Sequence, residues 1–293
     1  MTVAVFGATG FIGRHLIDRL NADGIEYVAF SHRSGGVDAL QIDFENPSSY
    51  AHLLQGVETA VLLVTQSRPG TFADKAENEV VRNVLPYARF TEIAASSGIK
   101  RVVYLSSGGT VYGRQADRSP IGEDHPLHPI SPYGIGKLMI ETMLRPFLRQ
   151  AGIALTVLRP ANPVGGGQQV GREGLVASAV HAALEDITLK VWGDGSIVRD
   201  YFAVSDLADA IVRSFSDRAA DRIYNVGSGA GVSVNEVFDV VEATIGRRVR
   251  REYSPGRDVD VPVNVLSFAA IERDLGWRPQ LTLEEIVQGL LPQ

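Results

Sequence analysis

Short runs of β-branched and other apolar residues alternate with longer stretches of helical periodicity in the first half of the chain. The apolar runs predict strands over 2–6, 25–31, 39–42, 59–65, 101–106 and 153–159. The longer stretches predict a helix over 11–21 and a second helix over 72–97, which Pro86 is expected to disturb. Strands and helices that alternate in this way are typical of a doubly wound parallel α/β sheet.

The pattern changes after residue 160, where glycine-rich loops at 165–169 and 192–196 separate shorter elements. Ser233 and Thr282 each precede a glutamate by three residues, a spacing that predicts a capped helix start. We therefore expect a larger domain over 1–163, with later returns of the chain near 199–227 and 262–274. A smaller lobe is expected to consist mainly of 164–293.

Composition and charge exclude several classes of protein. The chain has 293 residues, of which 45% are hydrophobic and 21% charged, values that are typical of a globular protein with an ample core. Its net charge of -6 argues against a nucleic-acid binder, which would carry a basic surface. The chain has no cysteine, and this excludes disulfides, a thiol nucleophile and a zinc–thiolate site. No apolar run approaches ~18 residues and the first strand starts at once, so we expect no membrane span and a cytoplasmic location.

Three glycines lie between the first predicted strand and the first predicted helix. Gly7, Gly10 and Gly13 form a G-x-x-G-x-x-G pattern, with Phe11 and Ile12 at the start of the helix. A glycine turn at this place lets the backbone approach a pyrophosphate while the helix N-terminus faces the negative charge. The alternative is a tight turn with close helix packing and no ligand. The position between strand and helix favours a dinucleotide-binding, Rossmann-type domain.

The end of the second predicted strand bears on the choice of dinucleotide, because an acidic residue there normally holds the adenosine ribose of NAD. The chain has Ser31, His32 and Arg33 at this place instead. No carboxylate would repel a 2′-phosphate and Arg33 could pair with one, so these residues favour NADP over NAD unless Arg33 points to solvent. Asp43, after the third strand, could bind the adenine amino group or form an ordinary turn.

Tyr133 and Lys137 are spaced as Y-x-x-x-K in a predicted helix that follows a loop rich in glycine and proline. Side chains four residues apart share one face of a helix. An ammonium beside a phenol favours the phenolate and lowers a pKa that is otherwise near 10. The pair therefore predicts proton transfer coupled to hydride chemistry at a carbon that bears a hydroxyl or a ketone. His125 and His128, by contrast, lie between prolines that fix an extended backbone, and we expect no metal site there.

These motifs together resemble those of the extended short-chain dehydrogenases/reductases. More narrowly, the chain is similar to the NAD-dependent epimerase/dehydratase family, in the branch of UDP-glucose 4-epimerase and related nucleotide-sugar enzymes. The resemblance covers nearly the whole chain. Besides the glycine turn, it is carried by Asn83 and by the segments 106–113, 131–137, 159–162, 192–201, 257–260 and 275–279.

The resemblance implies roles for the helical pair and a state of assembly. Tyr133 would be the catalytic acid/base, and Lys137 would bind the nicotinamide ribose while it lowers the pKa of the tyrosine. The long helix over 72–97 and the helix that carries Tyr133 would form the interface of a homodimer.

The resemblance also implies a nucleotide-diphosphate sugar as substrate. Asn162 would meet its diphosphate, and Arg199 and Arg257 would clamp the phosphates with bidentate guanidinium groups. Asp260 would hold the nucleotide ribose or a neighbouring arginine.

The chain departs from the family pattern after the fifth strand. Gly108 stands where the 4-epimerases usually carry the hydroxyl that completes the catalytic triad. Ser107 and Thr110 flank it and either could hydrogen-bond the sugar 4-oxygen, with Thr110 slightly preferred. Gly109 and Thr110 also replace the Asp-Glu pair of nucleotide-sugar 4,6-dehydratases, so we do not expect that reaction.

Three functions remain open on the sequence. The first is a nucleotide-sugar 4-epimerase that works through a transient 4-keto sugar and keeps its cofactor. The second is an NADPH-dependent reductase of a nucleotide-linked 4-keto sugar, which Ser31 and Arg33 favour. The third is a regulatory or structural protein on the same fold, although such relatives usually lose the Tyr/Lys pair and both residues are present here.

Overall fold

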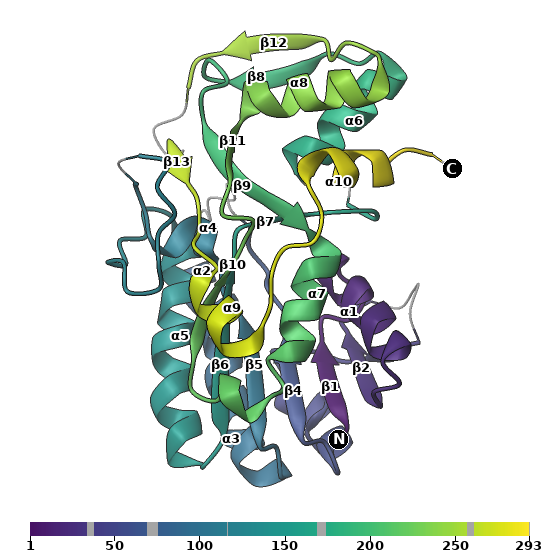
Figure 1. The fold of residues 1–293 in the computed structure, drawn as a ribbon. Coiled ribbons are helices and arrows are strands. Elements are labelled where there is room, and N and C mark those ends of the chain that lie inside the picture. Colours follow the sequence, from purple (N-terminus) through teal and green to yellow (C-terminus); the bar gives the residue numbers. More distant parts are fainter. Residues whose placement is uncertain (34–37, 69–75, 116, 169–173, 257–260, 293) are drawn as a thin grey trace.

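Seven parallel strands form the central sheet of the larger part of the molecule (Figure 1). The computed structural model describes residues 1–33, 38–68, 76–115, 117–168, 174–256 and 261–292. From one edge to the other, the strands are β3 (Leu40–Gln41), β2 (Tyr27–Ser31), β1 (Val3–Phe6), β4 (Thr59–Leu62), β5 (Arg101–Leu105), β6 (Ala154–Pro160) and β10 (Ile223–Val226). Every neighbouring pair is parallel. The strand order, which reverses between β1 and β4, confirms the expected doubly wound, Rossmann-type sheet.

Helices cover both faces of this sheet. One face carries α1 (Phe11–Ala22) and α7 (Val204–Arg213), and the other carries α3 (Leu85–Ser97) and α5 (Pro132–Gln150). Alternate residues of β1 face opposite ways, because Val5 belongs to the core beneath the first pair of helices and Phe6 to the core beneath the second. A strand that is buried on both faces consists of a continuous apolar run, and this explains why the strands are recognisable in the sequence.

The long helix predicted over 72–97 is interrupted. α2 (Ala76–Glu79) leads into a π-helical turn, η3 (Val80–Val84), and then into α3, where Pro86 lies in the first turn. A proline within continuous helical backbone cannot donate to a carbonyl of the preceding turn, and its ring disfavours regular α-helical geometry there. The expected disturbance near Pro86 is confirmed, and 72–75 lie outside the described residues.

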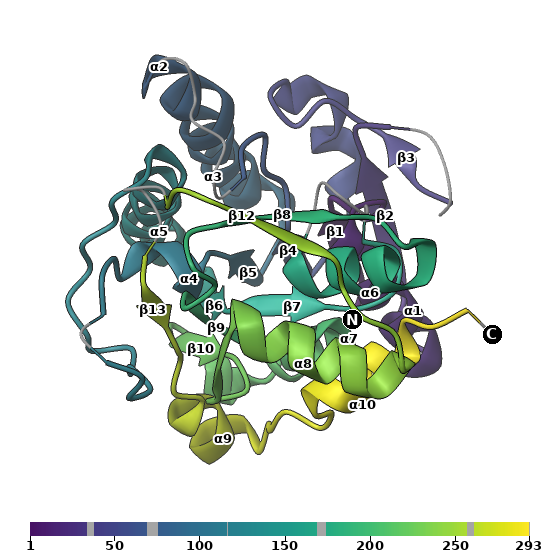
Figure 2. The same cartoon turned by 90° about the horizontal axis from the view of Figure 1, so that it is seen from above.

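A smaller lobe lies above the carboxyl ends of the seven strands (Figures 1 and 2). One of its sheets contains β7 (Asn162–Val164), β9 (Val198–Ala203), β11 (Gly231–Ser233) and β13 (Val263–Asn264), and the other contains β8 (Leu189–Trp192) and β12 (Arg251–Ser254). Its helices are α6 (Leu175–Glu185), α8 (Val234–Ile245) and α10 (Leu283–Gly289). Reciprocal hydrogen bonds form the capping boxes predicted at Ser233 and Thr282. In the part of the chain that the structure describes, no helix is long and apolar enough to cross a membrane.

The segments expected to return to the large domain divide between the two parts. β10 lies in the central sheet and α9 (Ala269–Leu275) packs beside it, whereas β9 and β13 pair with each other in the small lobe. The remaining short helices are α4 (Gly108–Val111), η1 (Pro47–Ser49), η2 (Ala51–Leu54) and η4 (Asp217–Ala219).

One buried carboxylate joins segments of both parts. Asp200 on β9 is fully buried and accepts hydrogen bonds from the backbone N–H groups of Ser228 (2.7 Å), Gly229 (3.2 Å) and Leu266 (3.1 Å). The Ser228 hydroxyl donates a further bond at 2.6 Å. The loop after β10 and the chain after β13 are thereby held against β9, above the carboxyl edge of the central sheet.

Candidate active site

The glycine turn after β1 is built for close approach. Gly7 has φ +93°, a conformation that side chains rarely adopt, and a Cβ on Gly13 would lie 2.2 Å from the Gly7 carbonyl oxygen. α1 therefore packs against the turn at a distance that only glycine allows. No side chain caps the first turn of α1 and that turn holds no acidic residue. Its N–H groups, which begin at Phe11 and Ile12, fit a pyrophosphate.

The end of β2 offers hydroxyl groups rather than a carboxylate. The Ser31 hydroxyl is buried, bonds to the Thr9 hydroxyl at 2.5 Å and accepts the Arg33 backbone N–H at 3.1 Å. The Arg33 side chain is exposed. Asp43 is exposed too, and its carboxylate accepts the Glu45 N–H at 3.0 Å, so it forms the turn that was one of the two expectations for it.

Helix α5 places Tyr133 and Lys137 on one buried face. The Ser131 hydroxyl accepts the Gly134 N–H at 3.1 Å and so fixes the start of this helix. Tyr133 is 8% exposed and Lys137 is 6% exposed. The Lys137 ammonium donates to the Leu105 carbonyl at the end of β5 (2.8 Å) and lies 5.6 Å from the centroid of the Tyr133 ring. The predicted pair is thus assembled at the carboxyl edge of the sheet.

Burial dominates the electrostatics of this pair. It raises the pKa of Tyr133, an effect that Ser107 opposes and the charge of Glu79 increases. Burial also lowers the pKa of Lys137 from 10.5 to about 8, although nearby carboxylates oppose the shift. The expected lowering of the tyrosine pKa by Lys137 is therefore not what the structure shows. Loss of hydration outweighs the ammonium, which is bonded to Leu105.

The two candidate hydroxyl residues after β5 differ in what they face. The Ser107 hydroxyl acts on the Tyr133 phenol, because a side-chain hydrogen bond from it lowers the tyrosine pKa. The Thr110 hydroxyl instead lies 3.5 Å from the Ser107 carbonyl oxygen. This effect on Tyr133 favours Ser107 over Thr110, against the slight preference drawn from the sequence.

Gly108 has no room for a side chain. A Cβ there would lie 2.4 Å from Leu266 Cδ1 and 2.8 Å from the Arg159 carbonyl oxygen. The hydroxyl that the family resemblance places at this position could not fit without movement of both neighbours. The space is occupied by Leu266, which follows β13 in the chain.

A buried ion pair that the sequence analysis missed lies one helical turn beyond Lys137. Glu141 follows Lys137 by one helical turn, and its carboxylate binds the Arg159 guanidinium with Nη2–Oε2 at 2.6 Å. Arg159 Nη1 also donates to the Tyr112 hydroxyl at 2.9 Å, and the Ser106 hydroxyl donates to Glu141. The available signal was the i, i+4 spacing of Lys137 and Glu141 on one face.

Two of the four residues expected to bind the nucleotide-diphosphate part of the substrate lie on neighbouring strands. Asn162 on β7 donates to the Asp200 carbonyl at 3.1 Å. Arg199 on β9 donates to the Val261 carbonyl at 2.6 Å. Arg257 and Asp260 lie outside the described residues.

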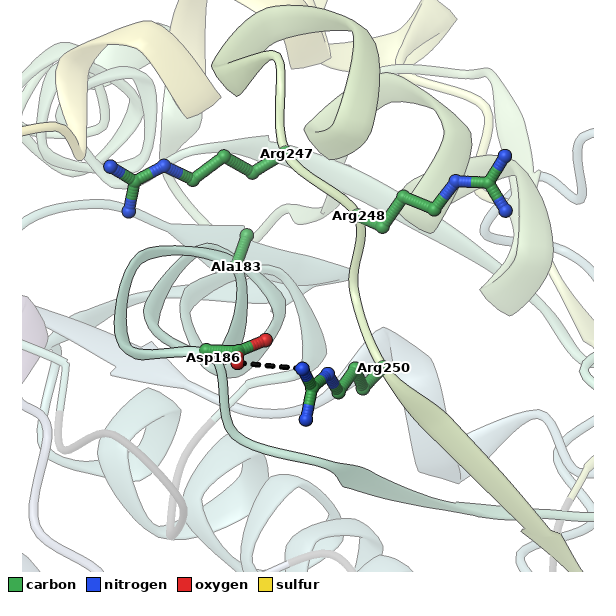
Figure 3. A pocket seen from close by; sticks show the side chains of 5 residues that line it. All are labelled: Ala183, Asp186, Arg247, Arg248 and Arg250. Carbon is green, nitrogen blue, oxygen red and sulfur yellow. Dashed lines mark ion pairs between the residues drawn. The ribbon is translucent and has the colours of Figure 1, made fainter.

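A separate hollow in the small lobe contains none of these residues. It is lined by Ala183, Asp186, Arg247, Arg248 and Arg250 (Figure 3). Arg250 pairs with Asp186 at 2.8 Å, and Arg247 donates to the Leu184 carbonyl at 3.0 Å. Cations at the C-terminal end of α6 complement the helix dipole, so we assign these contacts to helix termination.

The fold and the site together define a dinucleotide-dependent enzyme of the short-chain dehydrogenase/reductase type. A glycine turn faces the start of α1, and a buried Tyr/Lys pair lies at the same edge of the sheet. Residues 3–227 match the NAD dependent epimerase/dehydratase family. The chain belongs to this family.

Individual relatives cover nearly the whole chain. The UDP-glucose 4-epimerase of Mycolicibacterium smegmatis is 33% identical over 300 residues, which span 97% of this chain and 96% of the relative. The crystal structure of UDP-glucose 4-epimerase from Thermotoga maritima with UDP-glucose matches with a TM-score of 0.92 at 30% identity, covering 99% of this chain and 97% of that one. The structure of the UDP-glucose 4-epimerase from Thermus thermophilus with NAD matches with a TM-score of 0.90 at 26% identity, covering 99% of both chains.

Proposed function

We propose that the protein is an NAD-dependent nucleotide-sugar 4-epimerase that acts on a UDP-hexose. The observation that carries the proposal is the buried pair of Tyr133 and Lys137 at the carboxyl edge of the sheet. A protein that only bound a dinucleotide would have no need for this pair. Similarity over the whole chain to UDP-glucose 4-epimerases supports the choice of reaction and substrate.

The residues of the turn fit NAD. Gly7, Gly10 and Gly13, with the N–H groups of Phe11 and Ile12, would hold its pyrophosphate, because the turn is uncapped and leaves the backbone accessible. Lys137 would hold the nicotinamide ribose, and Asp43 stays a candidate for the adenine amino group. When bound, NAD supplies an acceptor and donor of hydride.

Tyr133 would then move the proton of the sugar 4-hydroxyl. As the phenolate it would accept this proton while C4 gives up hydride. Burial raises the pKa of Tyr133, so the phenolate depends on stabilisation by its neighbours, and Ser107 supplies part of it through a hydrogen bond. Lys137 is largely cationic near neutral pH, since its pKa lies at about 8, and its positive charge favours the phenolate that accepts the proton. The substrate would pass through a 4-keto sugar that turns in the site, where C4 would regain a hydride on its other face and the 4-oxygen would recover the proton from Tyr133.

The small lobe would bind the nucleotide. We assign 1–163 to dinucleotide binding and 164–293 mainly to substrate binding. Asn162 on β7 and Arg199 on the neighbouring strand β9 would contact the diphosphate. Arg257 stays a prediction for the diphosphate, and Asp260 stays one for the nucleotide ribose or a neighbouring arginine.

We also propose a homodimer. The neighbouring helical segments η3, α3 and α5 carry a stripe of exposed apolar side chains, namely Val80, Val81, Leu85, Ile135 and Met139. Exposed apolar residues that are contiguous in this way favour burial against another surface, and the resemblance assigns these helices to a second copy of the chain. A cytoplasmic location stays a prediction.

The experiment combines cofactor identity with turnover. Denatured protein is expected to release stoichiometric NAD, which mass spectrometry identifies, and native protein is expected to interconvert UDP-glucose and its 4-epimer. Tyr133→Phe is expected to lower turnover by at least ~10²-fold while it retains NAD, because the phenol moves the proton and does not bind the dinucleotide. Near-normal turnover of this variant would refute the assignment.

A second candidate is the NADPH-dependent reduction of a nucleotide-linked 4-keto sugar. It is favoured by the absence of a carboxylate at the end of β2 and by the exposed Arg33. Protein that is purified without cofactor and binds NADPH more tightly than NADH would support it. Arg33→Asp would then weaken NADPH binding far more than NADH binding, whereas equal effects would exclude a 2′-phosphate contact.

A further inference from the structure

A buried carboxylate lies beside the Tyr/Lys pair on an element far away in the sequence. Glu79, the last residue of α2, is 5% exposed and its Oε1 accepts the Ser67 hydroxyl at 3.1 Å. Asn83 donates to the same hydroxyl at 3.1 Å and accepts the Gln66 backbone N–H at 2.7 Å. This chain of hydrogen bonds ties Glu79 to the loop that follows β4.

The second carboxylate oxygen of Glu79 lacks a hydrogen-bond partner among the described residues. A buried carboxylate that is only partly satisfied costs free energy, because it loses hydration and gains too little in return. If the side chain only filled space, an apolar residue would do so at a lower cost in free energy. The feature therefore points to a role of the charge itself.

Gly136 provides the space for this carboxylate. A Cβ on Gly136 would lie 2.3 Å from Glu79 Oε1. Gly136 directly precedes Lys137 and lies three residues after Tyr133 in α5. The carboxylate is thus seated against the segment of backbone that carries both members of the pair.

We propose that Glu79 is a positioning residue whose buried negative charge sets the proton affinities of Tyr133 and Lys137. The proposal rests on the proposed function, because it concerns the acid/base step of the same site. A negative charge favours the ammonium over the amine and the phenol over the phenolate. It keeps Lys137 cationic near neutral pH, although the side chain is buried, and it raises the pKa of Tyr133.

The charged and titratable neighbours support this direction. The charge of Glu79 raises the pKa of Lys137 and of Tyr133 on α5 and adds to the rise in the pKa of Tyr104 on β5. Glu141, one turn further along α5, acts on Lys137 in the same sense. The buried phenol of Tyr87 on α3 interacts with Tyr133 and Tyr104 as well.

The first test reads the proton affinity of Lys137 without turnover. The chain contains four lysines, so ¹³C labelling at lysine Cε gives a spectrum in which Lys137 can be assigned by its absence in Lys137→Met. Glu79→Gln is expected to lower the titration midpoint of Lys137 by roughly one pH unit. Glu77→Gln is the matched control, because Glu77 lies in the same helix but is exposed, and it should leave the midpoint unchanged.

Gly136→Ala tests the same idea with the carboxylate retained. The new methyl group must displace the end of the Glu79 side chain, and alanine is otherwise favourable inside a helix. This variant is expected to lower the Lys137 midpoint as well, and the effects of Gly136→Ala and Glu79→Gln should not add. An unchanged midpoint in Glu79→Gln, or in Gly136→Ala if Glu79→Gln does not fold, would overturn the proposal.

The second test is the pH profile of epimerisation with UDP-glucose. Glu79→Gln is expected to move the acidic limb of the profile to lower pH by roughly one unit, because Tyr133 releases its proton more easily. A loss of turnover with an unshifted limb would show a merely structural role and overturn the proposal. If wild-type protein did not turn over nucleotide sugars but the Lys137 midpoint still shifted, the proposed function would fail while the assignment of Glu79 would hold.

Discussion

Replacing Glu141 by glutamine is expected to destabilise the protein strongly, because it leaves the Arg159 guanidinium buried without its counter-charge. Arg159 is 1% exposed and Glu141 is 4% exposed, so water cannot replace the lost partner. Three guanidinium–carboxylate hydrogen bonds join the two side chains, at 2.6, 3.1 and 3.2 Å. Glutamine can accept some of these bonds but carries no charge.

The magnitude follows from burial. Breaking a buried pair by removing one partner costs about 3–5 kcal/mol, most of it from the uncompensated charge. For a chain of this size each kcal/mol lowers the melting temperature by about 2–4 °C, so a decrease of roughly 10 °C is expected. Loss of Glu141 also removes a charge that raises the pKa of Lys137.

The assay is urea unfolding of wild type and variant, followed by fluorescence and circular dichroism in parallel. Asp186→Asn provides the control, because it breaks an exposed ion pair with Arg250 whose side chains are 67% and 62% exposed. That change should cost less than about 1 kcal/mol. The double variant Glu141→Met with Arg159→Met should cost less than the sum of the single changes, since no charge is then left buried.

The reasoning would be refuted if Glu141→Gln cost no more than the exposed control. Such a result would mean that water or a rearranged side chain compensates the Arg159 charge. Burial of the ion pair would then not determine how much the pair contributes to the free energy of unfolding.

Three further predictions concern the interface, the glycine turn and pH. Val81→Glu combined with Met139→Glu should convert a dimer into a monomer in sedimentation, because both side chains lie on the exposed apolar stripe; a monomeric wild type would contradict the dimer. Gly13→Ala should abolish NAD retention and lower the free energy of unfolding by more than about 1 kcal/mol, since the new Cβ would lie 2.2 Å from the Gly7 carbonyl oxygen. Undiminished NAD binding in a thermal-shift assay would count against a pyrophosphate site there. The pKa of Lys137 is lowered from 10.5 to about 8, so the native state binds fewer protons than the unfolded state between these values and the free energy of unfolding rises with pH across that window. Relative to Lys137→Met, the free energy of unfolding of the wild type should rise by about 2 kcal/mol between about pH 7 and pH 9.5. If urea unfolding gave the same difference in free energy between the two proteins at every pH, the folded protein would not hold a neutral lysine.

Local signals made much of the fold predictable. The central strands are buried on both faces, so each consists of a continuous apolar run, and short-range spacing identifies both the glycine turn and the pair of Tyr133 and Lys137. Even the interruption near Pro86 follows from the chemistry of a single residue. These features depend on residues that are close together in the chain.

Contacts between distant segments could not be predicted in the same way. Glu79 meets Gly136, and Glu141 meets Arg159, only because the sheet order brings their elements together. The rise in the pKa of Tyr133 likewise depends on burial, which the Y-x-x-x-K spacing does not reveal.

The packing of Leu266 against Gly108 has a consequence for how this enzyme could change over generations. A serine at 108 would collide with the leucine side chain and with the Arg159 carbonyl oxygen, so it would be harmful as a first substitution. Shortening Leu266 first would empty a fully buried site at a cost of about 2–5 kcal/mol, and that step would be harmful as well. The two positions are therefore epistatic: a route to a hydroxyl at 108 crosses a fitness valley, and selection on this site would act more readily through Ser107.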